Sequence, residues 1–315
     1  MDEETLYRRK RIAIGLIIAA LIAGMAAVLI HFRSEMNARS SHIASLVAQA
    51  SAYETELNEL RRQQEVEELH IYKPEGSGAA VIAFLIDGES TLQTALSYGR
   101  SFGFTPSILL RADDPAVDAA LEAIAGTRLD VILYSRGIGT AAQIRSLQER
   151  VEDAGCQNTY AYLLRAGDDT EENRAILSSA GVRTLFLYGD SLTGRVAEDG
   201  TAELNYSYVS KSAYTPANRL SDLGGSEQGL LFAIDLVDTT VTARQMEEIL
   251  SVIRDEADSG RIAIGSTEDA VQTVRARQER EEANLAEFLE TQKTRSERIL
   301  ELEGIIQEIY SHWND

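Results

Sequence analysis

Short apolar runs recur between residues 79 and 266, and their spacing constrains the fold more than any other feature of the chain. Each run is too short for a helix, and near-continuous apolarity without alternation is typical of strands that are buried on both faces. The sequence therefore predicts seven buried strands: VIAFLID (81–87), SILLRA (107–112), DVILYS (130–135), TYAYLLRA (159–166), RTLFLYG (183–189), GLLFAID (229–235) and RIAIGS (261–266).

Segments with apolar residues at helical spacing lie between most of these runs. They cover residues 91–102, 115–124, 141–154, 170–180 and 243–257. Alternation of strands and helices predicts a parallel sheet, either closed into an α/β barrel or open and doubly wound. Residues 190–228 are rich in Asp, Gly, Ser, Thr and Tyr and break the alternation. We expect this stretch to be an irregular excursion over one rim of the sheet.

Residues 12–30 form a run of 19 residues without charge, which is long enough to cross the roughly 30 Å hydrocarbon core of a bilayer. Four basic residues precede the run directly, and only Arg33 and Arg39 follow it closely. The positive-inside rule then predicts a cytoplasmic tail (1–11) and a transmembrane signal-anchor (12–32) that crosses the cell membrane once, with the bulk of the chain extracytoplasmic. A cleaved signal peptide remains the alternative, because Ala-x-Ala-like triplets lie near residues 23–27.

Heptad patterns precede and follow the apolar runs. Residues 33–72 are predicted to form a helical coiled-coil stalk that ends at a Pro- and Gly-containing linker (73–78), and residues 272–315 are predicted to form a second coiled-coil helix. Antiparallel pairing of the two helices and a homo-oligomeric coiled coil both fit this pattern, as does packing of the stalk on its own domain. The apolar heptad positions are Ile43, Leu46, Ala50, Tyr53, Leu57 and Leu60, then Leu285, Phe288, Ile299, Leu302, Ile306, Ile309 and Trp313.

The charge of the chain argues against some partners. The net charge is −20, and the acidic residues are spread along the chain. Nucleic-acid binding is not expected, because phosphate contacts need clustered Lys and Arg. A single cysteine, Cys156, excludes an internal disulfide framework and a Cys-rich zinc site.

Five motifs follow one another along the predicted strands: residues 84–88 (FLIDG), 103–110 (GFTPSILL), 134–138 (YSRGI), 165–168 (RAGD) and 231–235 (LFAID). No single motif is specific, but in this order and spacing the domain at 79–271 resembles the polysaccharide deacetylase family, or NodB-homology domain. The resemblance implies an α/β fold, a deformed (β/α)7 barrel, here preceded by a transmembrane helix and flanked by coiled-coil helices.

Active members of that family use a divalent metal held by one Asp and two His, a second Asp as base and a late His as acid. Carried over by position, the base falls on Ile86, the two metal-binding His on Tyr134 and Ile138, and the late acid on Ile234. Only the metal-binding Asp is retained, as Asp87, and no histidine lies between residues 71 and 310. We therefore expect a degenerate, inactive member with no catalytic residues, no metal and no cofactor, and a former site made drier by apolar replacements.

The resemblance also indicates where a ligand would bind, at the carboxyl ends of the strands. Arg165 is expected to pair with Asp87 or Asp168, although Asp87 before Gly88 also fits a simple turn after a strand. Tyr206, Tyr208 and Tyr214 are suited either to stacking on sugar rings or to packing. The candidate binding residues of the barrel mouth are Asp87, Glu89, Tyr134, Arg136, Arg165, Asp168 and Asp235.

These features predict a membrane-anchored, extracytoplasmic pseudo-deacetylase that acts as a scaffold without hydrolysis. Its partner would be a protein, bound through the coiled-coil helices, or a cell-wall glycan. One alternative is an active carbohydrate hydrolase whose site is rebuilt from Asp87, Glu89, Asp168 and Asp235, because glycoside cleavage needs a pair of carboxylates. Another is a coiled-coil structural protein in which the barrel is a spacer.

Overall fold

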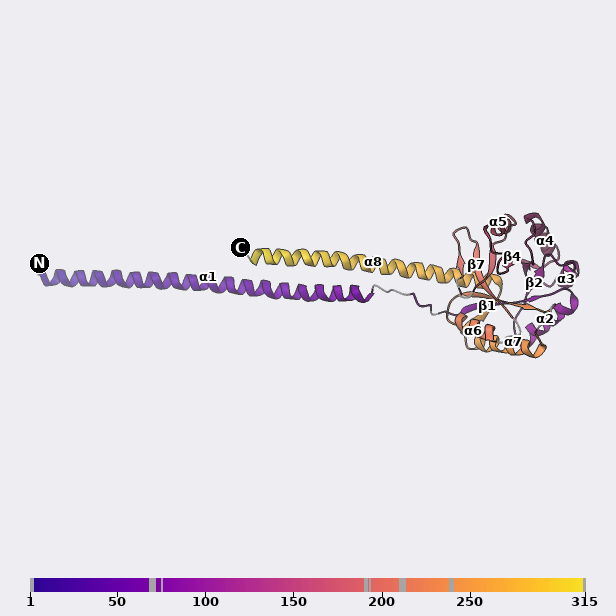
Figure 1. Ribbon diagram of the computed structural model, residues 1–315. Coiled ribbons are helices and arrows are strands. Elements are labelled where there is room, and N and C mark those ends of the chain that lie inside the picture. The colour runs from indigo at the N-terminus through magenta and orange to yellow at the C-terminus, as the bar shows by residue number, and fades with distance from the viewer. Residues whose placement is uncertain are drawn as a thin grey trace. The chain divides into compact units, whose positions relative to one another are not determined.

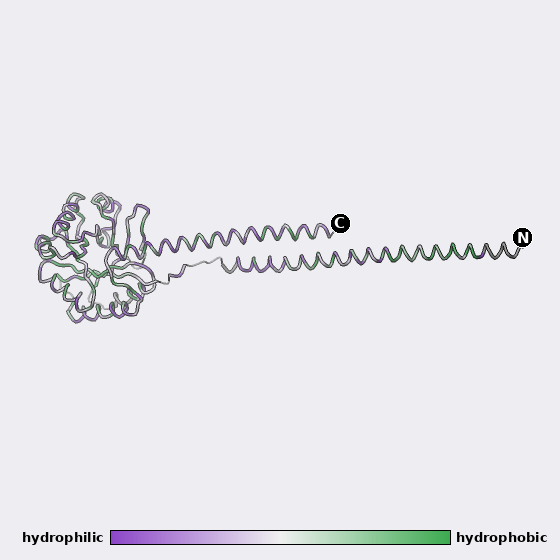
Figure 2. The backbone as a smooth tube through the Cα atoms, turned by 180° about the vertical axis from the view of Figure 1, so that it is seen from behind, coloured by the Kyte–Doolittle hydropathy of each residue, from purple (hydrophilic) through white to green (hydrophobic). Residues whose placement is uncertain are grey.

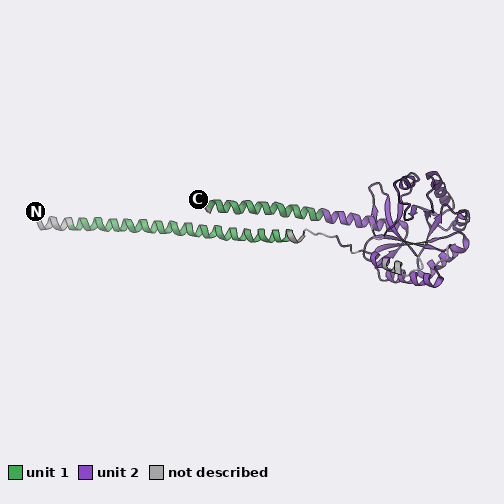
Figure 3. Cartoon of the chain, in the orientation of Figure 1, with its two compact units in different colours: residues 1–71, 286–315 green, residues 72–285 purple. Residues whose placement is uncertain are grey.

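The computed structural model describes residues 3–67, 72–74, 76–189, 192, 194–209, 214–237 and 241–313, so His70 lies outside the described residues. The chain divides into two compact units (Figure 3). Unit 1 combines Met1–Ile71 with Ala286–Asp315, and unit 2 is Tyr72–Leu285.

Unit 2 is a closed barrel of parallel strands, as the sequence predicted. β1 pairs with β8 along its length, and its last residues, Ala83 to Leu85, pair with β2, which closes the ring. The short β9 (Ile262–Ile264) pairs with the first residues of β1 and is not part of the ring. The seven strands of the ring are β1 (Gly78–Leu85), β2 (Ser107–Arg111), β3 (Asp130–Tyr134), β4 (Gln157–Leu164), β5 (Thr184–Tyr188), β7 (Ala202–Tyr208) and β8 (Gly229–Asp235).

Helices cover the outside of the barrel (Figure 1). Three of them begin at a threonine whose hydroxyl accepts a hydrogen bond from a backbone N–H in the first turn, namely Thr140, Thr170 and Thr242. Such caps satisfy amides that a helix start leaves without a partner. The helices are α2 (Glu89–Phe102), α3 (Val117–Ile124), α4 (Ala141–Asp153), α5 (Glu171–Ser179), α6 (Tyr214–Leu223) and α7 (Ala243–Asp258), and five of these were predicted.

The prediction of an irregular excursion at 190–228 was wrong. This stretch contains β6 (Arg195–Val196), α6 and β7, and β7 is a full member of the barrel. Its apolar residues alternate with polar ones instead of forming a continuous run, which is why the pattern was missed. Glu203 of β7 forms ion pairs with Arg174 at 2.6 Å and with Arg195 at 3.0 Å. The last predicted strand is β9, which has three residues and lies outside the ring.

Alternation along each strand separates two apolar layers. Side chains such as Val81, Phe186 and Leu231 fill the inside of the barrel, whereas Phe84, Leu110 and their equivalents pack under the helices. The first turns of α8 (Thr267–Trp313) contribute Ala270, Val271 and Val274 to the inner layer. The amino end of the barrel is therefore filled by apolar side chains of α8, and Asp130 Oδ2 accepts a hydrogen bond from the N–H of Thr267 at 3.4 Å.

The buried carboxylate of Glu227 bonds to residues near both ends of unit 2. Glu227 is 4% exposed. It accepts hydrogen bonds from the Tyr72 hydroxyl at 2.9 Å and from the N–H of Gly76 at 2.7 Å, and it pairs with Arg280 of α8 at 3.0 Å. Burial alone would raise the pKa of Glu227, but these hydrogen bonds outweigh burial and hold the pKa below its usual value.

Unit 1 contains α1 (Glu3–Glu67) and the C-terminal part of α8. Leu57 of α1 packs with Leu302 and Ile306 of α8. The contacts of Arg61 with Glu303 and of Glu54 with Tyr310 show that the two helices run antiparallel. Residues of the two predicted heptad seams therefore contact each other within one chain.

One helix among the described residues is long and apolar enough to cross a membrane. It is α1, whose most apolar window has a mean hydropathy of 2.8 and is 0% buried. The apolar residues lie along its N-terminal part (Figure 2). A signal sequence near an N-terminus has the same properties, so length and composition alone do not separate the two.

Candidate functional site

A pocket of about 650 Å³ lies at the carboxyl ends of the barrel strands. Every strand of the ring contributes to its lining, because the last inward-facing residue of each strand ends there. We call this cavity the mouth pocket. Its polar lining consists of Arg111, Tyr134, Arg136, Arg165, Tyr188, Tyr206, Tyr208 and Asp235.

Three arginines line the mouth pocket, and they differ in their ion pairs and hydrogen bonds. Arg111 pairs with Asp114 and lies 3.9 Å from Asp113, yet its Nε is buried without a hydrogen-bond partner. Arg165 donates one hydrogen bond, from Nη1 to the carbonyl oxygen of Arg136 at 3.3 Å. Within the described part of the chain, neither Arg136 nor Arg165 forms an ion pair.

The predicted ion pair between Arg165 and Asp87 or Asp168 was therefore wrong. Arg165 and Asp168 are the ends of a tight turn, closed by a hydrogen bond from the Asp168 N–H to the Arg165 carbonyl at 3.1 Å. Gly167 in this turn has a φ of 91°, which a residue with a Cβ rarely adopts. Asp87 lies in the turn before α2, where the Thr91 hydroxyl is 2.9 Å from its Oδ1 and the Asp87 N–H donates to Thr91 Oγ1 at 3.1 Å.

Tyrosines form one wall of the mouth pocket. The rings of Tyr188 and Tyr206 meet edge to face with centroids 5.8 Å apart, and Tyr188 is 56% exposed. The Tyr208 hydroxyl donates a hydrogen bond to Asp235 Oδ2 at 3.2 Å. Burial raises the pKa of Tyr206 to about 12, and burial followed by the charge of Asp235 raises the pKa of Tyr208. Both phenols are therefore neutral at physiological pH and can act as hydrogen-bond donors.

The structure brings together four of the seven sequence-predicted binding residues. Tyr134, Arg136, Arg165 and Asp235 line the mouth pocket, but Asp87, Glu89 and Asp168 do not. Glu89 is exposed at the start of α2 and accepts a hydrogen bond from Gln93 at 2.8 Å.

Sequence reasoning missed Arg111 and Tyr188 as lining residues. Each is the last residue of its strand, and each precedes a small residue where the apolar run ends. This position is the signal that could have identified them, because the carboxyl ends of barrel strands surround one opening. The side chain of Tyr214 lies outside the described part of α6.

The expectation of a drier site was also wrong. Ile86 and Ile234 are 3% and 0% exposed and belong to the outer layer, under the helices, and Ile138 packs against the same layer. On a strand, adjacent residues face opposite sides, so a position matched by sequence alone can fall on the outer face. The mouth itself is polar.

The residue types at the mouth do not fit the divalent metal that the family resemblance implies. Asp235 is the one carboxylate of the lining, and the lining contains no His or Cys. Among the residues that the structure describes, no group of three or more His, Cys, Asp or Glu side chains could hold a metal ion. Tight zinc sites use at least three protein ligands.

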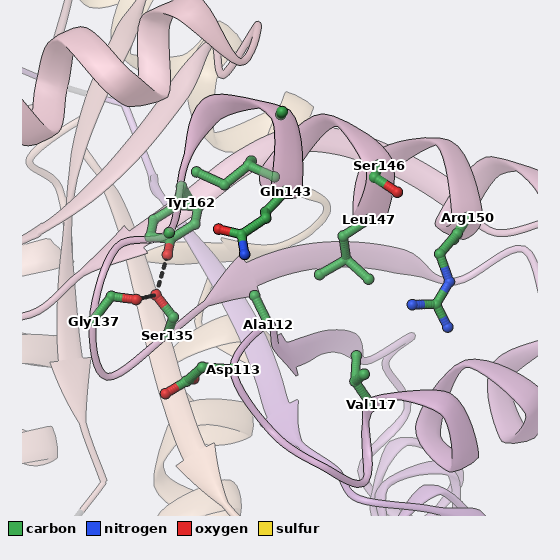
Figure 4. Close-up of a pocket in the computed structure, with 13 residues that line it drawn as sticks. Ala112, Asp113, Val117, Ser135, Gly137, Gln143, Ser146, Leu147, Arg150 and Tyr162 are labelled. Carbon is green, nitrogen blue, oxygen red and sulfur yellow. Dashed lines mark hydrogen bonds between the residues drawn. The ribbon is translucent and has the colours of Figure 1, made fainter.

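A second pocket, of about 530 Å³, lies beside α4 on the outer side of the barrel (Figure 4). The Ser135 hydroxyl donates to the Gly137 carbonyl at 2.7 Å, so the buried Tyr162 hydroxyl in turn donates to Ser135 Oγ. The side chain of Gln143 accepts a hydrogen bond from the N–H of Thr140 at the start of α4, and Arg150 pairs with Asp118. The polar side chains named here already have partners, which leaves the mouth pocket as the better candidate site.

Comparison with solved structures gives several matches, one of which is described here. The crystal structure described as "putative polysaccharide deacetylase from Mycobacterium smegmatis" aligns with a TM-score of 0.46 and 13% sequence identity, over 67% of this chain and 96% of that chain. The likeness concerns the path of the backbone, and no activity follows from it. No protein-family model matches the chain, and no curated protein matches it.

Proposed function

We propose that the barrel is a binding domain that recognises a glycan at the mouth pocket without hydrolysing it. One observation carries this proposal: the pocket combines four tyrosines and three arginines with a single carboxylate. A site built for recognition needs flat surfaces and hydrogen-bonding groups, whereas a hydrolytic site also needs a metal or a second carboxylate.

The lining suits a sugar ring. A pyranose has apolar C–H faces and a rim of hydroxyl groups, and tyrosine offers an apolar ring together with a polar tip. The exposed ring of Tyr188 provides a face, while Tyr208 and Asp235 provide a donor and an acceptor beside it. The pocket volume of about 650 Å³ lies within the usual range for small-ligand sites.

The same lining argues against hydrolysis. Glycoside cleavage uses two carboxyl groups placed on either side of one bond. Of the four carboxylates that a rebuilt site would use, only Asp235 lines the pocket. Amide deacetylation in the resembling family uses a metal, which the residues of the mouth do not fit.

The long apolar helix supports anchoring in a cell membrane. In this proposal, residues 12–32 cross the bilayer once, the four basic residues before them stay in the cytoplasm, and the barrel lies outside the cell. The barrel would then be tethered to the cell surface, where it binds the glycan of the cell wall as an inactive relative of polysaccharide deacetylases.

Co-sedimentation with insoluble cell-wall glycan tests the binding proposal. The full chain in detergent should sediment with the glycan, should release no acetate from it, and should contain far less than one equivalent of metal after incubation with zinc. Stoichiometric zinc together with acetate release would overturn the proposal, as would a failure to sediment.

A second candidate function is protein binding through the paired helices of unit 1. The apolar cluster of Leu57, Leu302 and Ile306 supports a stable helical pair whose outer faces can bind a partner. Removal of residues 267–315 is a poor test, because Ala270, Val271 and Val274 are part of the barrel interior. Truncation after Leu285 is better. This function would be favoured if the truncated chain no longer captured a partner in membrane pull-downs. Variants of the mouth pocket should still capture that partner.

A further inference from the structure

We infer that the mouth pocket selects a glycan that carries an oxyanion, either a carboxylate or a phosphate, and that Arg136 and Arg165 bind this group. The inference rests on the proposed function, since it names the class of glycan that the same pocket takes.

The two arginines are available in a chain where acidic partners are abundant. The chain has 50 acidic and 30 basic residues, and other arginines of the barrel, such as Arg174, form ion pairs. Among the described residues Arg136 and Arg165 form none, although both line a polar pocket. The hydrogen bond of 3.3 Å from Arg165 to the Arg136 carbonyl holds the two residues at one side of the rim.

The third arginine of the lining, Arg111, adds a further donor. Arg111 pairs with Asp114, and its buried Nε lies 3.9 Å from Asp113 Oδ1, too far for a hydrogen bond, so its N–H has no hydrogen-bond acceptor. A buried donor without a partner costs roughly 1–3 kcal/mol unless a ligand or water supplies the acceptor. An oxyanion that enters the mouth would supply acceptors for this group.

Most of the acidic groups near the pocket already form hydrogen bonds or ion pairs. Asp235 accepts hydrogen bonds from Tyr208 at 3.2 Å and from the N–H of Val237 at 2.9 Å. Asp114 pairs with Arg111, and Asp113 accepts from the N–H of Arg136 at 3.2 Å. Asp168 lies close enough for its charge to influence Tyr206 but does not line the pocket. Within the lining itself, three arginines stand against one carboxylate.

This combination defines a ligand with two features. Guanidinium groups bind carboxylates and phosphates through paired, charge-assisted hydrogen bonds. The ring of Tyr188, supported edge to face by Tyr206, suits the apolar face of a sugar. A neutral sugar would use the tyrosines alone and would leave the arginines without partners.

Calorimetric titration of the full chain in detergent tests the inference through matched ligands. The probes are an oligogalacturonate tetramer and its methyl ester, which differ in the carboxylate charge, and glucose 6-phosphate beside glucose. We expect at least one anionic probe to bind about 10-fold or more tightly than its neutral counterpart, with an affinity that falls as salt is added. The two pairs show whether the preferred oxyanion is a carboxylate or a phosphate.

Variants locate the effect. Arg165→Gln and Arg136→Gln should each abolish most of the preference for the anionic probe, while Arg145→Gln, on the exposed face of α4, should keep it. Equal binding of anionic and neutral probes would overturn the inference and leave glycan binding intact. Retention of the full preference in both mouth variants would also overturn it. Absence of binding to every saccharide, including chitotetraose, would overturn the proposed function itself. The comparison of ligands needs no variant, so a misfolded variant cannot hide the answer.

Discussion

The ring of Tyr188 meets the ring of Tyr206 edge to face across neighbouring strands, with centroids 5.8 Å apart. The register of β5 and β7 places these two residues directly opposite each other at the last paired position of the two strands. Tyr206 is buried and Tyr188 is 56% exposed, so the inner ring supports the outer one as a fixed wall of the mouth pocket.

Tyr188→Ala should lower the affinity for a bound oligosaccharide about tenfold, because it removes the exposed face on which a sugar would stack. Titration of the full chain with the same oligosaccharide measures the change. Tyr160→Ala is a matched control, since Tyr160 is also partly exposed, at 38%, but lines a pocket formed with the start of α8. Equal losses in the two variants, or no loss in Tyr188→Ala, would contradict the assigned role of the wall.

Glu227 should make the stability of the barrel depend on pH. Its pKa is lowered in the folded chain, so its stabilising contribution is present above the ordinary Glu pKa of about 4.3 and is lost as pH falls through the lower folded value. Glu227→Gln should reduce the free energy of unfolding by about 2 kcal/mol at pH 7, and this difference should shrink below about pH 4.

Urea unfolding of both proteins at several pH values measures this difference. Glu198→Gln is the control, because Glu198 is exposed in the turn after β6 and should change stability by less than about 0.5 kcal/mol. The difference in free energy of unfolding between wild type and Glu227→Gln could instead stay constant from pH 7 to pH 3. This would show that the contacts of Glu227 with Tyr72, Gly76 and Arg280 do not depend on its charge.

The strands of the barrel could be predicted where burial on both faces made the sequence continuously apolar, as in β1 and β8. β7 could not, because Glu203 on its outer side is satisfied by Arg174 and Arg195 and gives the strand a mixed pattern. Helices such as α4 were predictable since Thr140 and Gln143 mark the start and the apolar residues keep a helical period.

The mouth was harder to predict than the fold. Which residues face it depends on where each strand ends and on which face each residue occupies, to a precision of one residue. That precision separates Asp235, which lines the pocket, from Ile234, which packs under the helices. It also explains why Arg111 and Tyr188 were missed. The sequence showed polar residues at the ends of strands. It did not show which of them meet, because they come together only when the strands close into a ring.

The helices of unit 1 should pair within one chain. With Cys156 replaced by Ser, a chain carrying Arg61→Cys and Glu303→Cys should give a product of monomer mass on treatment with a short bis-maleimide, because Arg61 and Glu303 contact each other at 2.5 Å. Gel electrophoresis distinguishes this product from a crosslinked dimer. A dimer formed by the Arg61→Cys single variant would instead favour the homo-oligomeric coiled coil.

The membrane orientation can be tested by thiol labelling of intact cells. Ser41→Cys, on the C-terminal side of the apolar run, should react with a membrane-impermeant maleimide, and Thr5→Cys should react only after lysis. The reverse pattern would contradict the proposed orientation. Recovery of the Ser41→Cys chain in the soluble fraction, without its first residues, would show a cleaved signal peptide instead of an anchor.

The central claim is that the mouth pocket binds a glycan and leaves it intact. Saturation-transfer NMR of an N-acetylated acidic oligosaccharide mixed with the full chain and zinc measures binding and hydrolysis in one sample. The account predicts saturation transfer to the sugar ring protons that Tyr188→Ala weakens, with the acetyl signal and the chain length unchanged after a long incubation. Free acetate, shortened oligosaccharide or a lack of transfer in the wild-type chain would contradict it.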